Sequence, residues 1–148
     1  MVQSRIDTAL LEEKIGYRFK NTELIERALI HSSYSNETGL RNHHLLCNER
    51  LEFLGDSVLS IITSNYLYKT FTDCPEGDLT RLRAEVVCER ALSGYAEEIG
   101  LGGYLLLGVG EEKNNSGGIS KGLLISAGIG AAAGVAAVMY FLFRKKKK

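Results

Sequence analysis

Three carboxylates stand at a spacing that suits one face of a helix. Glu49, Glu52 and Asp56 lie at positions i, i+3 and i+7 of a segment that continues to about Thr70. At about 100° per residue, an α-helix places such positions within a narrow arc. Like charges at this spacing repel, so a bound cation would stabilise them. Mg²⁺ is the first candidate, because it prefers oxygen ligands and is often held by only one or two carboxylates.

The helix that would present these acids has a plausible first residue and an apolar side. Asn48 directly precedes the helix and is a plausible N-cap. Gly55 lies inside it, where glycine costs about 1 kcal/mol relative to alanine, and favours close approach by a ligand or a second backbone. The alternative for the three acids is a solvated surface. Five apolar residues are expected to cover the opposite side of the helix: Leu51, Leu54, Val58, Ile61 and Ile62.

Four segments of the chain resemble the motifs of one enzyme family, in that family's order and spacing. Residues 49–57 read E-R-L-E-F-L-G-D-S and resemble the signature of the ribonuclease III family of double-strand-specific RNA endonucleases. The other three segments are 28–34 (A-L-I-H-S-S-Y), 76–84 (E-G-D-L-T-R-L-R-A) and 105–113 (L-L-L-G-V-G-E-E-K). The resemblance extends over about residues 6–118 and stops there.

The resemblance implies an enzyme that hydrolyses phosphodiester bonds of double-stranded RNA with water activated by Mg²⁺ or Mn²⁺. It makes Glu52 and Asp56 metal ligands, with Asp56 the central one. It gives catalytic roles to Asp56 and Glu49, and makes Glu76 a supporting acid near the metal or its waters.

The resemblance also implies a homodimer that cuts the two strands of an RNA duplex at two sites. Phe53 and Leu54 are the expected contacts between the subunits. Lys+Arg and Asp+Glu number 18 each, but residues 144–148 are all basic, so residues 1–143 carry 13 basic against 18 acidic side chains. This part of the chain therefore lacks the basic excess typical of a domain that grips phosphates unaided.

The sequence departs from the family's pattern near its end. Family members carry D-x-x-E on a later helix, whose two acids complete the metal cluster. Here no Asp or Glu follows Glu112, and the helical register that ends at Tyr140 puts Gly130 and Ala133 at the acidic positions. Half of the expected carboxylate set is missing.

The last part of the chain is its most apolar segment. Residues 122–143 carry no charge and would span about 33 Å as a helix, enough for a bilayer core of about 30 Å. Gly130 and Gly134 form G-x-x-x-G, and Ser126 extends the same small face, as in helix-pairing surfaces. We expect a membrane-spanning helix that anchors a cytoplasmic domain, although the basic tip at 144–148 favours the reverse orientation. The alternative is a buried core helix.

Apolar periodicity predicts an all-α domain over residues 1–118 and a hydrophobic helix with a basic tip over 119–148. The resemblance implies that the first of these is a ribonuclease III-like helical endonuclease domain, incomplete at its C-terminal end. Residues 35–47 are expected to form a loop, and His31 to be a hydrogen-bonded structural group. Arg81 and Arg83 are expected to be surface charges, and the three cysteines to be reduced. The predicted helices are 4–15 with Gly16 as its stop, one capped by Asn21, 49–70, one opening at Asp78 or Thr80, and 89–99.

Three interpretations stay open from the sequence alone. The first is a membrane-tethered, Mg²⁺-dependent endoribonuclease of the ribonuclease III type that acts in RNA processing. The second is a catalytically impaired module for dimerisation or RNA docking, held at a membrane. The third is a truncated nuclease domain whose last segment, 119–148, is foreign to it.

Overall fold

The computed structural model describes residues 6–39 and 42–110, and the regular elements in this part of the chain are all helical. The one sheet-like pairing among them is an isolated parallel bridge between Ile30 and Leu106. The predicted all-α class is therefore confirmed for this part. The elements are α1 (Thr8–Ile15), α2 (Thr22–Ala28), α3 (Ser32–Glu37), η1 (His43–Leu45), α4 (Glu49–Thr70), α5 (Glu76–Val86), α6 (Glu89–Ile99) and η2 (Leu101–Tyr104).

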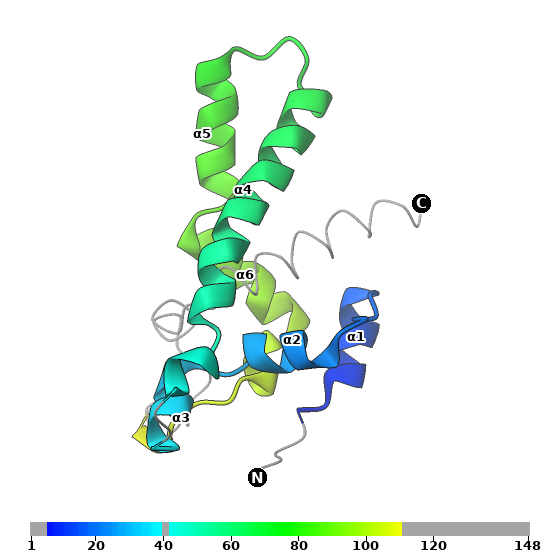
Figure 1. Cartoon of the computed structure of the whole chain (residues 1–148). Helices are drawn as coiled ribbons and strands as arrows, with labels where there is room; N and C mark the ends of the chain where they lie inside the picture. Colours follow the sequence, from blue (N-terminus) through cyan, green and yellow to red (C-terminus); the bar gives the residue numbers. More distant parts are fainter. Residues whose placement is uncertain (1–5, 40–41, 111–148) are drawn as a thin grey trace.

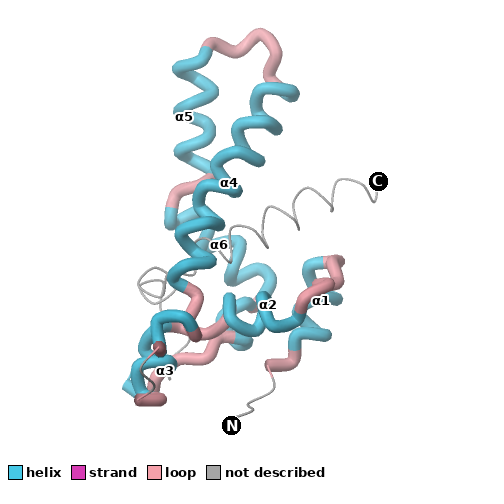
Figure 2. Tube along the Cα trace, in the orientation of Figure 1, coloured by secondary structure: helices cyan, strands magenta, loops and turns pink. Residues whose placement is uncertain are grey.

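The helices form a compact base and a projecting hairpin. Figure 1 shows α4 and α5 side by side as an antiparallel pair that rises away from α1, α2 and α6, and Figure 2 shows the short loop that joins them at the tip. No residue of α5 is fully buried, whereas α6 buries Leu92, Ser93, Ala96 and Ile99. The cluster of buried hydrophobic residues described next therefore lies in the base, whereas in the hairpin only α4 buries hydrophobic side chains, Leu59 and Leu67.

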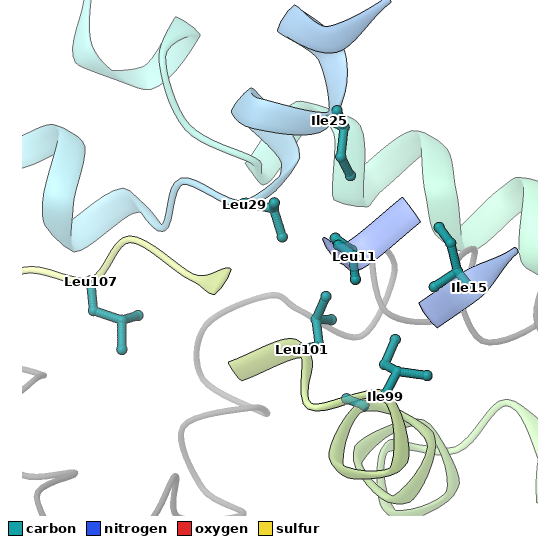
Figure 3. Packing of buried hydrophobic residues seen from close by; sticks show 8 residues of the cluster. Leu11, Ile15, Ile25, Leu29, Ile99, Leu101 and Leu107 are labelled. Atoms are coloured by element: carbon teal, nitrogen blue, oxygen red, sulfur yellow. The ribbon is translucent and has the colours of Figure 1, made fainter. Parts of the chain in front are cut away.

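The core is built from helix positions one turn apart in α1, α2 and α6. Leu11 and Ile15 come from α1, and Ile25 and Leu29 come from α2 and its C-cap. Figure 3 shows these side chains converging with three more from the end of the described chain. Burying each such side chain stabilises the fold by about 1.5–3 kcal/mol. The remaining members of the cluster are Ala96, Ile99, Leu101 and Leu107.

Two of the helix ends that the sequence predicted are confirmed. Gly16 ends α1 in the left-handed region at φ +69°, where glycine has no Cβ to clash. The Asn21 side chain accepts a hydrogen bond from the Glu23 N–H at 3.1 Å and so caps α2. The first helix begins later than predicted, at Thr8, because the Asp7 side chain accepts from the Leu10 N–H and sets the start there.

Two other predictions are wrong. Residues 35–47 are not simply a loop, because α3 extends to Glu37 and η1 follows. Polar side chains satisfy the backbone there, since the Ser35 and Thr38 hydroxyls donate to carbonyls three residues earlier. The fifth helix opens at Glu76 and not at Asp78 or Thr80. The Pro75 carbonyl accepts from the N–H groups of residues 78 and 79, which closes the first turn directly after the proline.

The predicted membrane helix lies outside the described residues. Residues 122–143, with Ser126, Gly130 and Gly134, belong to the range 111–148 that the structure does not describe. Within residues 6–39 and 42–110, no helix combines the length and the apolar character needed to cross a bilayer. The membrane span therefore stays a prediction from the sequence.

Candidate functional site

The acid stripe, Glu49, Glu52 and Asp56, lies on the first two turns of α4. Glu52 is half-buried, and Glu49 and Asp56 are exposed. Burial raises the pKa of Glu52 above its ordinary value, and the charges of Asp56 and then Glu49 raise it further. The three carboxylates thus repel one another across one face, as their spacing predicted. Such a cluster is stabilised either by protons or by a cation.

The acids fit a metal site with few protein ligands better than one in which protein side chains fill every coordination position. In the described part of the chain, no group of three or more His, Cys, Asp or Glu side chains is placed to hold a metal ion. Glu52 and Asp56, one helical turn apart, are the pair with the chemistry to share one ion. Two carboxylate ligands suit Mg²⁺, which keeps several waters, and do not suit a metal that needs a full set of protein ligands.

Glu76 is not brought to the acid stripe within one chain. It is the first residue of α5, across a five-residue connection from the end of α4. The stripe lies at the other end of α4, whose 22 residues span about 33 Å. The Glu76 Oε1 instead accepts a hydrogen bond from the Thr80 hydroxyl at 2.8 Å. The antiparallel hairpin is the physical reason, because it carries the start of α5 away from the start of α4.

The buried face of α4 is not the apolar side that lies opposite the acids. Leu54, Val58 and Ile61 are exposed, and α4 buries Gly55, Leu59, Thr63 and Leu67. Two rows of α4 are apolar enough to face a core, and periodicity alone does not choose between them. Phe53, at 81% exposure, and Leu54 therefore stand on the surface, as a contact between subunits requires.

Asn48 holds the start of α4 in place through its backbone. It occupies the N-cap position and is almost completely buried, but its side chain makes no capping hydrogen bond, so that part of the prediction is wrong. Its N–H donates to the Ile30 carbonyl at 2.9 Å, and its own carbonyl accepts from the Glu52 N–H at 2.8 Å. The first turn of α4, with its acids, is thereby tied to the segment before α3.

The two arginines of α5 differ in their surroundings. Arg81 makes an exposed ion pair with Asp78 at 3.2 Å, in line with the surface role predicted for it. Arg83 is half-buried, and its Nη1 donates to the Ser64 hydroxyl of α4 at 3.0 Å. Nothing in the local sequence indicates this bond between the two helices of the hairpin, because the residues are 19 positions apart.

His31 is a structural group, as predicted. It is buried at the N-cap of α3, and its Nδ1 accepts from the Ser33 N–H at 3.3 Å and lies 2.7 Å from the Ser33 hydroxyl. Sequence reasoning missed two neighbours that act on the backbone, Ser33 and Glu37. Ser33 belongs to the family-like segment 28–34, so the motif was a signal for it, whereas Glu37 lies in the polar stretch 35–47 that resembles an ordinary loop.

Comparison with known proteins agrees with this fold. A family model described as Ribonuclease-III-like matches residues 21–139. "Ribonuclease 3" of Syntrophotalea carbinolica is 49% identical over 118 residues, which cover 80% of this chain and 49% of that protein. "Ribonuclease 3" of Oceanobacillus iheyensis is 48% identical over 108 residues, 73% of this chain and 46% of that protein. The nuclease domain of ribonuclease III from Campylobacter jejuni superposes with a TM-score of 0.73 at 32% identity, covering 95% of this chain and 97% of that one.

The helical base, the α4–α5 hairpin and the acid stripe together define a helical nuclease-type domain. The chain belongs to the ribonuclease III-like family. The family match reaches residue 139 and so continues past residue 118, where the motif resemblance stops. The chain spans about half the length of the curated relatives that it matches.

Proposed function

We propose that this chain is an endoribonuclease of the ribonuclease III type, which hydrolyses phosphodiester bonds of double-stranded RNA with Mg²⁺ during RNA processing. The observation that carries the proposal is the acid stripe on α4, where the pKa of Glu52 is raised by burial and by its two acidic neighbours. A divalent cation would relieve this repulsion. Membership of the family supports the reaction class.

Each acid has a distinct part in this proposal. Glu52 and Asp56 would hold the ion, and the partial burial of Glu52 would limit the freedom of its carboxylate. Glu49, one turn before Glu52, would add negative charge beside the ion. When bound, Mg²⁺ activates water and neutralises charge on the phosphate. Because no acid follows Glu112, turnover is expected to be orders of magnitude below that of a member with D-x-x-E.

Cleavage of long double-stranded RNA with and without Mg²⁺ tests the proposal. The change Asp56→Asn keeps the shape of the side chain and removes the central charge, so it should abolish Mg²⁺-dependent cleavage. Asp73→Asn is the matched control, because Asp73 is an exposed acid in the α4–α5 connection. The proposed enzyme activity would be refuted if the wild-type chain did not cleave the RNA, or if Asp56→Asn cleaved it as fast as the wild type.

We also propose that the chain forms a homodimer through the exposed side of α4. Phe53, Leu54, Ile61 and Tyr68 are 81%, 59%, 69% and 73% exposed. An apolar surface of this kind along one helix marks an interaction site, and the spacing of seven between residues 54, 61 and 68 is typical of paired helices. A related structure from Campylobacter jejuni is described as having a region involved in dimer formation.

The mass in solution tests the dimer. Ile61→Asp should convert the dimer to a monomer in light scattering after size exclusion, because it places a charge on the apolar surface. Leu10→Asp is the control, since Leu10 is 53% exposed on α1, away from that surface. A wild-type monomer, or an Ile61→Asp variant that stays a dimer, would contradict the proposed interface.

A second candidate function is a catalytically impaired module for dimerisation or RNA docking, tethered to a membrane with its domain in the cytoplasm. The absence of acids after Glu112 and the uncharged run at residues 122–143 favour it. Carbonate extraction of membranes tests the tether, because an inserted helix stays with the pellet. Release of the chain into the supernatant would exclude an anchor.

A further inference from the structure

Four hydrogen bonds join the backbone of residues 106–109 to residues 29–37, two of them to backbone groups and two to side chains. The Leu106 N–H donates to the Leu29 carbonyl at 2.9 Å, and the Leu106 carbonyl accepts from the His31 N–H at 3.0 Å. Two side chains of α3 accept the next bonds. The Gly108 N–H donates to the Ser33 hydroxyl and the Val109 N–H to the Glu37 Oε1, both at 2.9 Å.

Ser33 and Glu37 are close to Gly108 as well as bonded to this backbone. A Cβ at residue 108 would lie 2.6 Å from the Glu37 Oε1 and 3.1 Å from the Ser33 carbonyl carbon. A Cβ at residue 108 would therefore displace the Glu37 carboxylate and press on the backbone of α3 at Ser33. The Ser33 hydroxyl is oriented by the buried His31, whose Nδ1 lies 2.7 Å away, so that its oxygen accepts from the Gly108 N–H.

Residues 29–31 also hold the start of α4. Ile30, the middle residue of this segment, forms the bridge to Leu106, and its carbonyl accepts a hydrogen bond from the Asn48 N–H. Figure 1 shows α3 and the yellow end of the described chain at the same end of the molecule as the first turn of α4. The position of residues 106–109 relative to the acid stripe is therefore fixed through residues 29–31.

We propose that Glu37 is a positioning residue for the acid stripe of the proposed nuclease. Its carboxylate accepts a hydrogen bond from the Val109 N–H and, together with the Ser33 hydroxyl, fixes where the backbone of residues 106–109 passes α3. The role in cleavage depends on the proposed function, whereas the hold on the backbone does not. Glu37 is itself exposed, so it contributes little to the core.

Amide hydrogen exchange tests the hold on the backbone. In the full chain, Glu37→Ala removes the acceptor and should speed exchange of the Val109 amide by roughly tenfold, the effect expected for one net hydrogen bond. Glu37→Gln keeps a carbonyl acceptor and should exchange within about twofold of the wild type. Glu26→Ala, at an exposed acid of α2, is the control and should change nothing. Wild-type exchange in Glu37→Ala would overturn the inference.

Kinetics and metal binding test the positioning role. Glu37→Ala should lower kcat for double-stranded RNA by about tenfold with KM unchanged, and Glu37→Gln should restore kcat. An altered KM with unchanged kcat, or no rescue by glutamine, would overturn the positioning role. A wild-type chain without cleavage refutes the proposed function alone. In that case calorimetry with Mn²⁺ tests the positioning role. Glu37→Ala should bind Mn²⁺ more weakly than the wild type, and Glu37→Gln should bind it as the wild type does. Binding of Mn²⁺ by Glu37→Ala with the affinity of the wild type would overturn the inference.

Discussion

Neutralising Glu52 should stabilise this protein at neutral pH. The pKa of Glu52 is raised in the folded state by burial, by Asp56 and by Glu49, in that order. A carboxyl whose pKa is raised on folding favours the fold only while it is protonated. Its ionised form, present at pH 7, opposes folding. Glu52→Gln keeps the size and the polar end of the side chain and removes the charge, so it should remove this penalty.

The size of the gain follows from the charges on α4. Glu52 faces Asp56 four residues later and Glu49 three residues earlier, which makes two like-charge pairs. Each pair costs about 0.2–0.5 kcal/mol at an exposed helix surface, so the variant should gain about 0.4–1 kcal/mol. The burial contribution is left out of this sum, because Glu52 is only half-buried and water screens it. For a chain of this length the gain corresponds to a rise in Tm of about 1–4 °C.

Thermal unfolding at a series of pH values, with and without Mg²⁺, measures the effect. The difference in Tm between Glu52→Gln and the wild type should be full at pH 7. It should shrink as the pH falls through the raised pKa, and vanish below the ordinary value of 4.5. Mg²⁺ at ten times its Kd should stabilise the wild type by about 1.4 kcal/mol and the variant by much less.

Two results would refute this reasoning. One is a Glu52→Gln variant that is no more stable than the wild type at pH 7. That result would mean that charge repulsion within the acid stripe does not destabilise the fold. The other is a gain that persists unchanged below pH 4.5, which would assign it to packing and not to charge. Asp73→Asn is the control for a general effect of net charge, because Asp73 lies in the loop that connects α4 and α5.

Three further changes test the fold. Leu29→Ala empties a core position and should lower the free energy of unfolding by about 2–5 kcal/mol in urea titration; a loss below 1 kcal/mol would contradict the core. Gly108→Ala should cost about 1–3 kcal/mol, because its Cβ meets α3, whereas Gly110→Ala has open space and should be neutral in the same titration. Asn21→Ala removes a cap and should lower stability by about 0.5–2 kcal/mol, seen as a lower Tm.

Local chemistry in the sequence determined most helix ends and the position of the acids. The prediction for residues 89–99 matches α6, and Gly16 and Asn21 stand where capping preferences put them. The acid stripe needed only the 3.6-residue period of a helix, so it too was visible in the sequence. These features depend on neighbours within about one turn, and no distant contact is needed to decide them.

Tertiary structure decided which surface each side chain faces. On α4 the buried row is Gly55, Leu59, Thr63 and Leu67, and the apolar row with Leu54 and Ile61 stays outside. Both rows satisfy the helical period, so only the packing of α5 and the base against α4 separates them. The folding of α4 and α5 into a hairpin likewise moved Glu76 away from the acids that its motif suggested.

The link between α3 and residues 108–109 shows the same limit. Ser33 and Glu37 lie more than 70 positions before the backbone groups that they bind. The motif at residues 28–34 includes Ser33 but does not name its partner, and nothing in the local sequence marks Glu37, because a polar side chain near a turn is ordinary. The sequence by itself determined most of the long helices and the spacing of the acids on α4. Only the tertiary structure decided which distant residues contact one another, because such contacts depend on how the whole chain packs around its core.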